Sequence, residues 1–120
     1  MLVDDDRTSN FLNKKILNNV FPETEILDFI SSEQALAYLK SGNTVDIVLL
    51  DINMPEIDGW QFIETTRAEN INNYKSIVLL TSSIDESDME KARTYKEIKG
   101  FISKPLKIDV FKKYLNSIGK

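Results

Sequence analysis

The chain has 120 residues, a length typical of a single domain, and we expect residues 1–120 to form one. Its composition, 42% hydrophobic and 28% charged, is that of an ordinary globular protein. It contains no cysteine and no histidine, which excludes disulfides, thiolate metal sites and imidazole catalysis, so any metal would be bound by oxygen. A net charge of −4 without a basic stripe argues against direct nucleic-acid binding. With no membrane-spanning apolar stretch and no secretory leader visible, we expect a cytoplasmic protein.

In the first part of the chain, apolar runs alternate with helical patterns. A short apolar segment at 1–3 predicts the end of a first strand, and a helix is expected at 8–20. The apolar face of that helix is expected to consist of Phe11, Leu12, Ile16 and Val20. A second strand is predicted at 25–30. The helix that follows, at 32–41, would have a capping box at Ser31 and Gln34, would end at Gly42, and would bury Ala35, Leu36 and Leu39.

The second part of the chain continues this alternation. The segments 45–50 and 76–80 are continuous apolar runs rich in β-branched residues, which is typical of strands buried on both faces of a parallel sheet. A helix at 59–69 lies between them. The chain is completed by a helix at 85–96, for which Ser83 and Glu86 have capping-box spacing, a strand at 100–103 and a helix at 107–118.

Five strands and five helices in strict alternation predict a doubly wound α/β fold with a parallel sheet. Short connections require right-handed crossovers and place helices on both faces of the sheet. Such sheets bind ligands beyond the carboxyl ends of their strands. The polar residues expected at that edge are Asp4, Asp5 and Asp6 after the first strand, Asp51 after the third, Thr81 after the fourth and Lys104 after the fifth.

This set of side chains supports phosphoryl transfer. Clustered carboxylates repel one another, and in a chain without histidine or cysteine the natural compensating ion is Mg²⁺, which prefers oxygen ligands. Asp51, at the end of a strand, is placed to act as a nucleophile that forms an aspartyl phosphate. Thr81 and Lys104 would hold the oxygens of the transferring group.

Each of these residues, taken alone, has a more ordinary explanation. An Asp run before a helix usually caps that helix, and an Asp at the end of a strand is more often a turn residue than a nucleophile. Thr81 alone would be a hydrogen-bonded loop hydroxyl, Lys104 a solvated cation and Trp60 a packing residue. The inference depends on their meeting at one edge of one sheet.

Four segments carry a resemblance to a known family: 3–6 (VDDD), 50–59 (LDINMPEIDG), 79–83 (LLTSS) and 101–105 (FISKP). Over essentially the whole chain they resemble the receiver domain of bacterial two-component response regulators. The resemblance implies a flavodoxin-like, five-stranded parallel sheet with strand order 2-1-3-4-5. It also implies a signalling switch controlled by phosphorylation, which catalyses only its own phosphorylation and dephosphorylation.

The resemblance implies an acceptor and a metal site. Asp51 would accept the phosphoryl group from a histidine on a separate histidine kinase or phosphotransfer protein, which fits a chain that has no histidine. Mg²⁺ would be bound directly by Asp5, Asp51 and the backbone carbonyl of Asn53, and through water by Asp4.

It also implies a switch. Thr81 would bind the phosphoryl group and move inward, and Phe101 would take the vacated space. Lys104 would contact the phosphate and, before phosphorylation, the acidic cluster. The family usually has a cis peptide bond before the proline that corresponds to Pro105, although the sequence alone leaves both isomers open.

The output surface would consist of the helix at 85–96, the strand at 100–103 and the last helix. Through it the domain would control an unidentified protein target, and it could form a homodimer. Candidate residues on this surface are Met89, Ala92, Arg93, Tyr95, Phe101, Phe111 and Tyr114.

Some features depart from the family pattern. The first strand, with three residues before the acidic pair, is shorter than usual, so it could be truncated or frayed. Phe101 stands where Tyr is frequent. Asn53 and Ser83 occupy positions that modulate the lifetime of the acyl phosphate, and neither is charged.

Three alternatives compete with this interpretation. A haloacid-dehalogenase-like phosphatase needs a second Asp two residues after its nucleophile, where this chain has Asn53. A flavin-binding module of the same topology needs a glycine- and hydroxyl-rich loop after the first strand, where the acidic residues 4–6 would repel a phosphate. The third alternative is a receiver that serves only as an interaction module and is never phosphorylated.

Overall fold

The computed structural model describes residues 1–82 and 85–118, in which five strands alternate with five helices. The elements in chain order are β1 Leu2–Val3, α1 Arg7–Val20, β2 Asp28–Phe29, α2 Ser32–Lys40, β3 Val45–Leu50, α3 Gly59–Ala68, β4 Tyr74–Thr81, α4 Glu86–Arg93, β5 Ile98–Ser103 and α5 Ile108–Ile118. None of the helices in this described part of the chain combines the length and hydropathy needed to cross a lipid bilayer.

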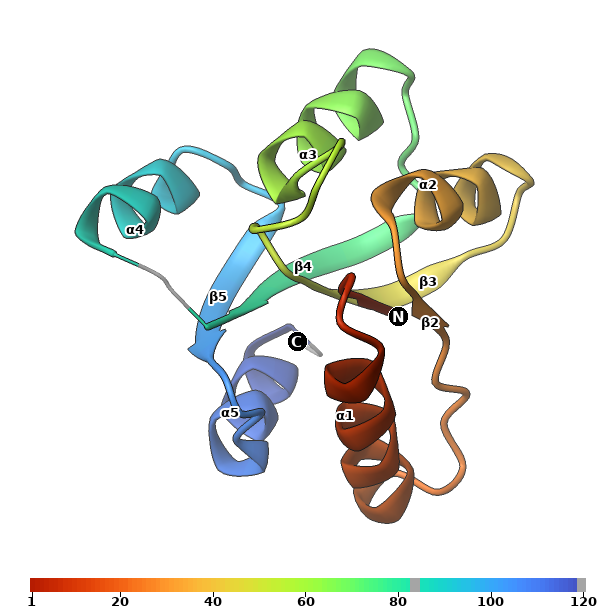
Figure 1. Cartoon of the computed structure of the whole chain (residues 1–120), viewed down its shortest axis with the longest axis vertical. Coiled ribbons are helices and arrows are strands. Elements are labelled where there is room, and N and C mark those ends of the chain that lie inside the picture. The colour runs from red at the N-terminus through yellow and green to blue at the C-terminus, as the bar shows by residue number, and fades with distance from the viewer. Residues whose placement is uncertain (83–84, 119–120) are drawn as a thin grey trace.

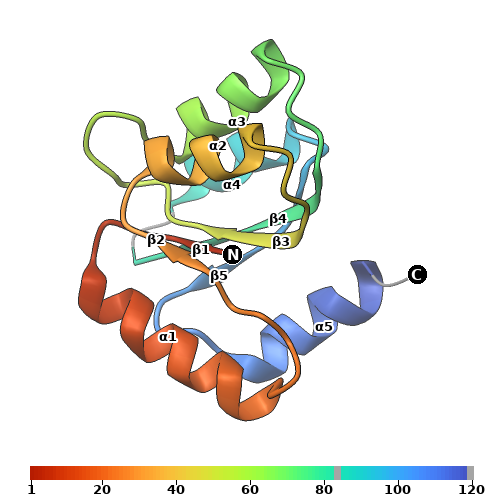
Figure 2. The same cartoon turned by 90° about the vertical axis from the view of Figure 1, so that its right-hand side faces the viewer.

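The strands form one parallel sheet in the order β2-β1-β3-β4-β5, which confirms the predicted topology. Helices cover both faces: α2, α3 and α4 lie on one side of the sheet, and α1 and α5 on the other (Figures 1 and 2). Because β1 lies between β2 and β3, strand order reverses beside β1. The carboxyl ends of β1 and β3 are therefore the expected place for a site.

Two apolar clusters, one on each face of the sheet, make up the core. The cluster under α2, α3 and α4 contains the fully buried Phe62 and Ile63 together with Leu50 and Leu79. The cluster under α1 and α5 is built around Val78, Leu17 and Phe111. Since β3 and β4 contribute side chains to both clusters, their sequences are apolar at nearly every position, as expected of strands covered on both faces.

The inward face of α1 differs from the predicted one. Phe11 and Leu12 are exposed by 65% and 52%, while Asn10, Asn13 and Leu17 are buried and Ile16 is only half-buried. The Asn10 amide explains this rotation, because its Nδ2 donates to the carbonyl oxygens of Asp4 (2.9 Å) and Phe29 (3.1 Å). A polar side chain on the inward face of α1 therefore joins the ends of β1 and β2.

Side-chain caps define where the helices begin. Asp6 accepts from the backbone N–H groups of Thr8 and Ser9. Ser31 accepts from the backbone N–H of Gln34, which is one of the two hydrogen bonds of the capping box predicted for that helix. The cap of α4 was predicted wrongly. Asp85, in a capping box with Asp88, begins this helix in place of the predicted Ser83–Glu86 box, and Ser83 lies outside the described residues.

Helix α4 is anchored mainly through side chains at its surface. It ends at Arg93, three residues before the predicted end, and Ala92 is its only buried residue. Beside it, the ring of Trp60 from α3 stacks on Tyr95 with centroids 5.7 Å apart. The Lys91 ammonium lies 4.8 Å from the Trp60 ring centroid, so a cation–π contact also ties α4 to α3.

Arg67 connects the Trp60–Tyr95 stack to the residue that precedes β5. The Arg67 guanidinium lies 4.6 Å from the Tyr95 ring centroid and donates two hydrogen bonds of 2.7 Å to the Glu97 carboxylate. The contacts thus form a continuous series that links α3 to the α4–β5 connection and to the residue before β5. The series consists of Trp60, Tyr95, Arg67 and Glu97.

Gly59 is required by a close approach of two backbones. A Cβ at this position would lie 2.7 Å from Ile52 Cα and 2.9 Å from Asp51 O, and neither backbone atom can move without shifting the loop after β3. We therefore expect Gly59→Ala to destabilise the protein by about 2 kcal/mol. Urea unfolding followed by circular dichroism measures this, and a change below ~0.5 kcal/mol would show that the loop adapts freely.

Candidate functional site

The carboxyl ends of four strands bring the predicted polar residues to one edge of the sheet. Asp4 follows β1, Asp51 follows β3, Thr81 is the last residue of β4, and Lys104 follows β5. Residues up to 100 positions apart in sequence are in direct contact there. Asp4, Asp51 and Thr81 are buried, with exposed fractions of 4%, 5% and 0%.

Lys104 bridges the two buried carboxylates. Its Nζ donates to Asp4 Oδ2 at 2.5 Å and to Asp51 Oδ2 at 3.2 Å. Burial by itself lowers the pKa of Lys104, but the hydrogen bonds and charges of Asp4 and Asp51 outweigh burial, so the pKa is raised. The ammonium stays charged and links three strand ends. The structure records the Lys104–Pro105 peptide bond as cis, which answers the question that the sequence left open.

Asp51 is held in a fixed orientation. Its Oδ1 accepts a hydrogen bond of 3.0 Å from the backbone N–H of Asn53, while Oδ2 faces Lys104. Burial raises the pKa of Asp51 above its ordinary value; the Asn53 N–H and Lys104 act in the opposite direction, and the negative charge of Asp4 adds to the increase. Burial and the charge of Asp4 therefore disfavour the ionised form of Asp51. A further cation nearby would stabilise that form.

Thr81 and Phe101 lie next to this cluster on β4 and β5. The Asn53 side chain donates from Nδ2 to Thr81 Oγ1 at 3.4 Å, a contact that the sequence did not predict. Phe101 is half-buried and packs against the cluster under α2, α3 and α4. Its backbone carbonyl accepts a hydrogen bond of 3.3 Å from the Tyr114 hydroxyl of α5.

The acidic residues fit a magnesium ion. Carboxylate oxygens of Asp4, Asp5 and Asp51 lie within 4.8 Å of one another, and Asp5 is exposed whereas the other two are buried. Two buried carboxylates beside an exposed one match the preference of Mg²⁺ for one or two carboxylates and several waters, because water can reach the group from the side of Asp5. Asp6 does not belong to this group, because its side chain caps α1 and its backbone N–H donates to Asp4 Oδ1 at 2.9 Å.

Comparison with known families shows to which family the chain belongs. Residues 1–116 match the response regulator receiver domain family. The chain belongs to this family. The matched range includes the residues that the structure brings together at the carboxyl edge of the sheet: Asp4, Asp51, Thr81 and Lys104.

Curated relatives of more than one kind are similar to this chain over part of their length. The cyclic di-GMP phosphodiesterase response regulator RpfG of Xanthomonas campestris is 25% identical over 108 residues, which are 89% of this chain and 28% of that protein. Stress response regulator protein 1 of Debaryomyces hansenii is 35% identical over 86 residues, which are 68% of this chain and 34% of that protein. The chain spans less than half the length of these curated relatives.

Solved receiver structures share the fold over almost the whole chain. A two-component response regulator from Cytophaga hutchinsonii is 31% identical with a TM-score of 0.86, covering 98% of this chain and 92% of that one. A response regulator receiver protein from Dyadobacter fermentans is 27% identical with a TM-score of 0.85, covering 98% and 94%. The flavodoxin-like topology is thereby confirmed.

The predicted output surface needs one correction. Ala92 and Phe111 are buried, with exposed fractions of 4% and 6%, and belong to the two core clusters. A partner cannot contact them without unfolding the packing beneath α4 and α5. The remaining candidates are at least partly accessible: Met89, Arg93, Tyr95, Phe101 and Tyr114.

Proposed function

We propose that residues 1–120 act as one phosphoryl-accepting switch, with Asp51 as the acceptor. The observation that carries the proposal is the contact of Lys104 with both Asp4 and Asp51, because it brings the acceptor, a cation and an acidic pair together at one edge of the sheet. The donor is a phosphohistidine on a separate histidine kinase or phosphotransfer protein, since this chain has no histidine.

The transfer step is a displacement at phosphorus. One carboxylate oxygen of Asp51 attacks the phosphorus atom, the bond from phosphorus to the donor imidazole nitrogen breaks, and the bonding electrons return to that nitrogen. Lys104 stabilises the negative charge on the phosphoryl oxygens, and Thr81 donates a hydrogen bond to one of them. Asp51, Asp5, the Asn53 carbonyl and, through water, Asp4 would hold Mg²⁺, which supplies charge neutralisation for the incoming group.

The new charge would then move the switch. A phosphoryl group adds about −2 charge at Asp51 and competes for Lys104 and for the Thr81 hydroxyl, which now accepts from Asn53. Moving an equilibrium from mostly inactive to mostly active takes about 5.5 kcal/mol of differential interaction. Charge-assisted hydrogen bonds at about 1.5–3 kcal/mol each can supply it, with Phe101 taking the space that Thr81 leaves.

The output of this switch is a protein contact. We propose that α4, β5 and α5 form the surface that changes and that it controls a protein target or a second copy of the chain in a homodimer. The domain acts in the cytoplasm, without contact to nucleic acid or membrane, and turns over no substrate other than its own acyl phosphate. An unphosphorylated interaction module is the second candidate, favoured by the full burial of Thr81, which must move for the switch to operate.

Incubation with acetyl phosphate and Mg²⁺ tests the proposal. Intact-mass spectrometry should record the gain of one phosphoryl group, and chelation of Mg²⁺ should prevent it. A protein that takes up none is the interaction module. A protein that hydrolyses many equivalents of a phosphate ester without retaining a phosphoryl group is a phosphatase of the haloacid-dehalogenase kind.

Binding of Mg²⁺ should change the fluorescence of Trp60. This residue follows Gly59, which contacts the backbone of Asp51, so a shift of the loop around Asp51 reaches the indole and its stack on Tyr95. We expect a saturable change on titration with Mg²⁺ and an affinity lower by about tenfold or more in Asp5→Asn, whose side chain is exposed. Glu56→Gln, outside the acidic cluster, serves as the control and should bind like the parent chain.

A further inference from the structure

The position of helix α4 depends mainly on contacts between aromatic rings and cations at the surface. Ala92 is the only residue of α4 that is buried, so the apolar core contributes little to holding this helix. The ring of Trp60, in the first turn of α3, stacks on the ring of Tyr95, just after the end of α4. The Lys91 ammonium of α4 lies over the same Trp60 ring. Through these contacts α4 is attached to α3, which lies on the same face of the sheet (Figures 1 and 2).

The start of α3 is in direct backbone contact with the acceptor. The Gly59 N–H donates to Ile52 O at 3.1 Å, and a Cβ at Gly59 would lie within 3 Å of both Ile52 Cα and Asp51 O. A capping box at Asp58 fixes the first turn of the helix. Since no side chain lies between these backbones, a displacement of the loop at Asp51 displaces the start of α3. Trp60 is the next residue and moves with it.

Tyr95 transmits a displacement to two elements of the proposed output surface. Its backbone N–H donates to Ala92 O of α4 at 3.1 Å, and its carbonyl accepts from Ile98 N, the first residue of β5, at 3.1 Å. Its ring contacts the Arg67 guanidinium, which binds both carboxylate oxygens of Glu97. A movement of the Tyr95 ring therefore reaches the end of α4 and the beginning of β5 together.

We propose that the Trp60–Tyr95 stack couples the acceptor site to α4 and β5. The stack holds α4 against α3 while Asp51 carries no phosphoryl group, and it weakens when phosphorylation displaces the loop after β3. This inference rests on the proposed function and adds a route that does not pass through Thr81 or Phe101. Ring stacking and cation–π attraction act only at contact distance, so one displacement of Trp60 weakens both contacts. The lightly anchored α4 then loosens and becomes accessible to a partner.

Hydrogen exchange of the backbone amides of α4, residues 86–93, tests this coupling. Mg²⁺ is present in both samples, acetyl phosphate is added to one, and intact-mass spectrometry reports the phosphoryl group. In the parent chain we expect phosphorylation to speed exchange in α4 by about fivefold or more. In Trp60→Leu exchange should be fast before phosphorylation and change less than ~twofold with it, because the stack is already absent. Trp60→Phe retains a ring and should keep the response.

Phosphoryl uptake itself should be the same in Trp60→Leu as in the parent chain, because Trp60 lies outside the acidic cluster. A residue that only stabilises α4 would raise exchange in both states and leave the fold-change on phosphorylation as it is in the parent. A parent-sized fold-change in Trp60→Leu would therefore overturn the proposal. So would a phosphorylated parent chain whose α4 exchanges at the unphosphorylated rate.

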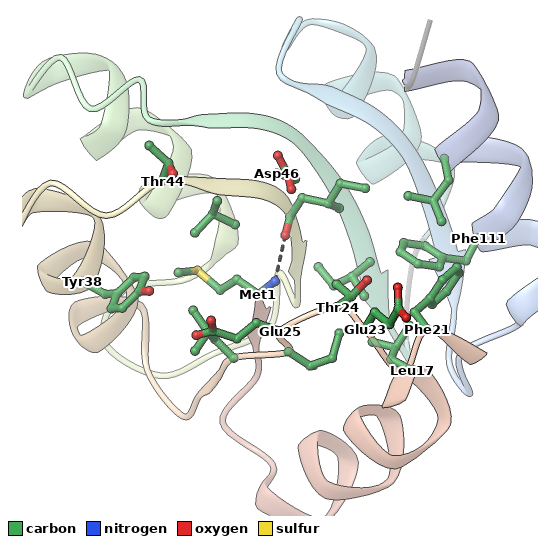
Figure 3. A pocket seen from close by; sticks show the side chains of 16 residues that line it. Met1, Leu17, Phe21, Glu23, Thr24, Glu25, Tyr38, Thr44, Asp46 and Phe111 are labelled. Atoms are coloured by element: carbon green, nitrogen blue, oxygen red, sulfur yellow. Dashed lines mark hydrogen bonds between the residues drawn. The ribbon is translucent and has the colours of Figure 1, made fainter. Parts of the chain in front are cut away.

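Tyr38→Leu is the matched control. Tyr38 belongs to α2, packs its ring on Phe29 with centroids 5.4 Å apart, and lines the largest cavity of the described residues, at the amino ends of the strands (Figure 3). The variant also loses a partly buried ring from a ring pair, but away from the acceptor and from α4. Its α4 should respond to phosphorylation as in the parent chain. Loss of the response here as well would show that general destabilisation, and not the stack, removes it.

A second readout does not require phosphorylation. Asp51→Asn changes the charge of the acceptor, so exchange in α4 should change by about twofold or more, and by less when Trp60→Leu is also present. Additive effects of the two substitutions would show that the stack does not connect the sites. If the parent chain takes up no phosphoryl group but the effects are not additive, the proposed function fails while the coupling stands. If uptake occurs and the effects are additive, the coupling fails while the proposed function stands.

Discussion

Asp51→Asn should abolish phosphoryl uptake from acetyl phosphate while the protein stays folded. The amide has nearly the shape of the carboxylate but lacks its nucleophilic charge. It also removes one of the two buried carboxylates that share Lys104. We therefore expect a Tm equal to that of the parent chain or higher, together with loss of the added mass in intact-mass spectrometry.

Asp46→Asn is the matched control. Asp46 lies in the same strand as Leu50, is exposed, and pairs with Lys75 at 3.3 Å. This variant should take up one phosphoryl group at the parent rate. Retention of uptake in Asp51→Asn would show that another residue accepts the phosphoryl group, and the proposed chemistry would then be wrong.

Lys104→Met should destabilise the protein by about 3 kcal/mol. Methionine preserves much of the side-chain length but leaves the carboxylates of Asp4 and Asp51 buried without their shared cation. For a domain of this size that loss corresponds to a fall in Tm of about 10 °C, measurable by calorimetry. Addition of Mg²⁺ should recover part of it, because the ion compensates the same charges.

Two further variants separate charge from packing. Lys75→Met, at an exposed ion pair, should change stability by less than ~1 kcal/mol. Combining Lys104→Met with Asp51→Asn should cost less than the sum of the single changes, because the unpaired carboxylate at position 51 is gone. A loss below ~1 kcal/mol in Lys104→Met alone would mean that solvent already screens the site and that Lys104 contributes little to the fold.

Sequence patterns identified the elements because local signals and tertiary structure agree for most of them. The strand predicted at 45–50 is observed as Val45–Leu50, since its run of apolar residues is explained only by burial on both faces. The strand predicted at 25–30 is reduced to Asp28–Phe29, because its length is set by its partner: β1 spans only Leu2–Val3. Strand length that depends on a neighbour cannot be read from the strand itself.

The face of α1 was mispredicted for a similar reason. Two sets of residues repeat at helical spacing, one apolar with Phe11 and Leu12 and one mixed with Asn10 and Leu17, and hydropathy favours the first. The structure buries the second because Asn10 bonds to carbonyls of Asp4 and Phe29. Those partners come from two other segments of the chain, and no local pattern announces them.

The candidate site was predictable to the extent that its residues follow strands. Asp51 and Lys104 could be assigned to one edge of the sheet once the strands were known, and the structure brings them into contact. The hydrogen bond from Asn53 to Thr81 could not be predicted, because it depends on how the loop after β3 folds back towards β4. The cis bond before Pro105 was likewise left open by the sequence.

The light anchoring of α4 has a consequence for how signalling specificity could change over time. With Ala92 as its one buried side chain, this helix contributes little to the core, so most of its positions can be substituted without loss of the fold. New partners could therefore be acquired by drift in the polar residues of α4, while the proposed acceptor site at the carboxyl ends of the strands stays under independent selection.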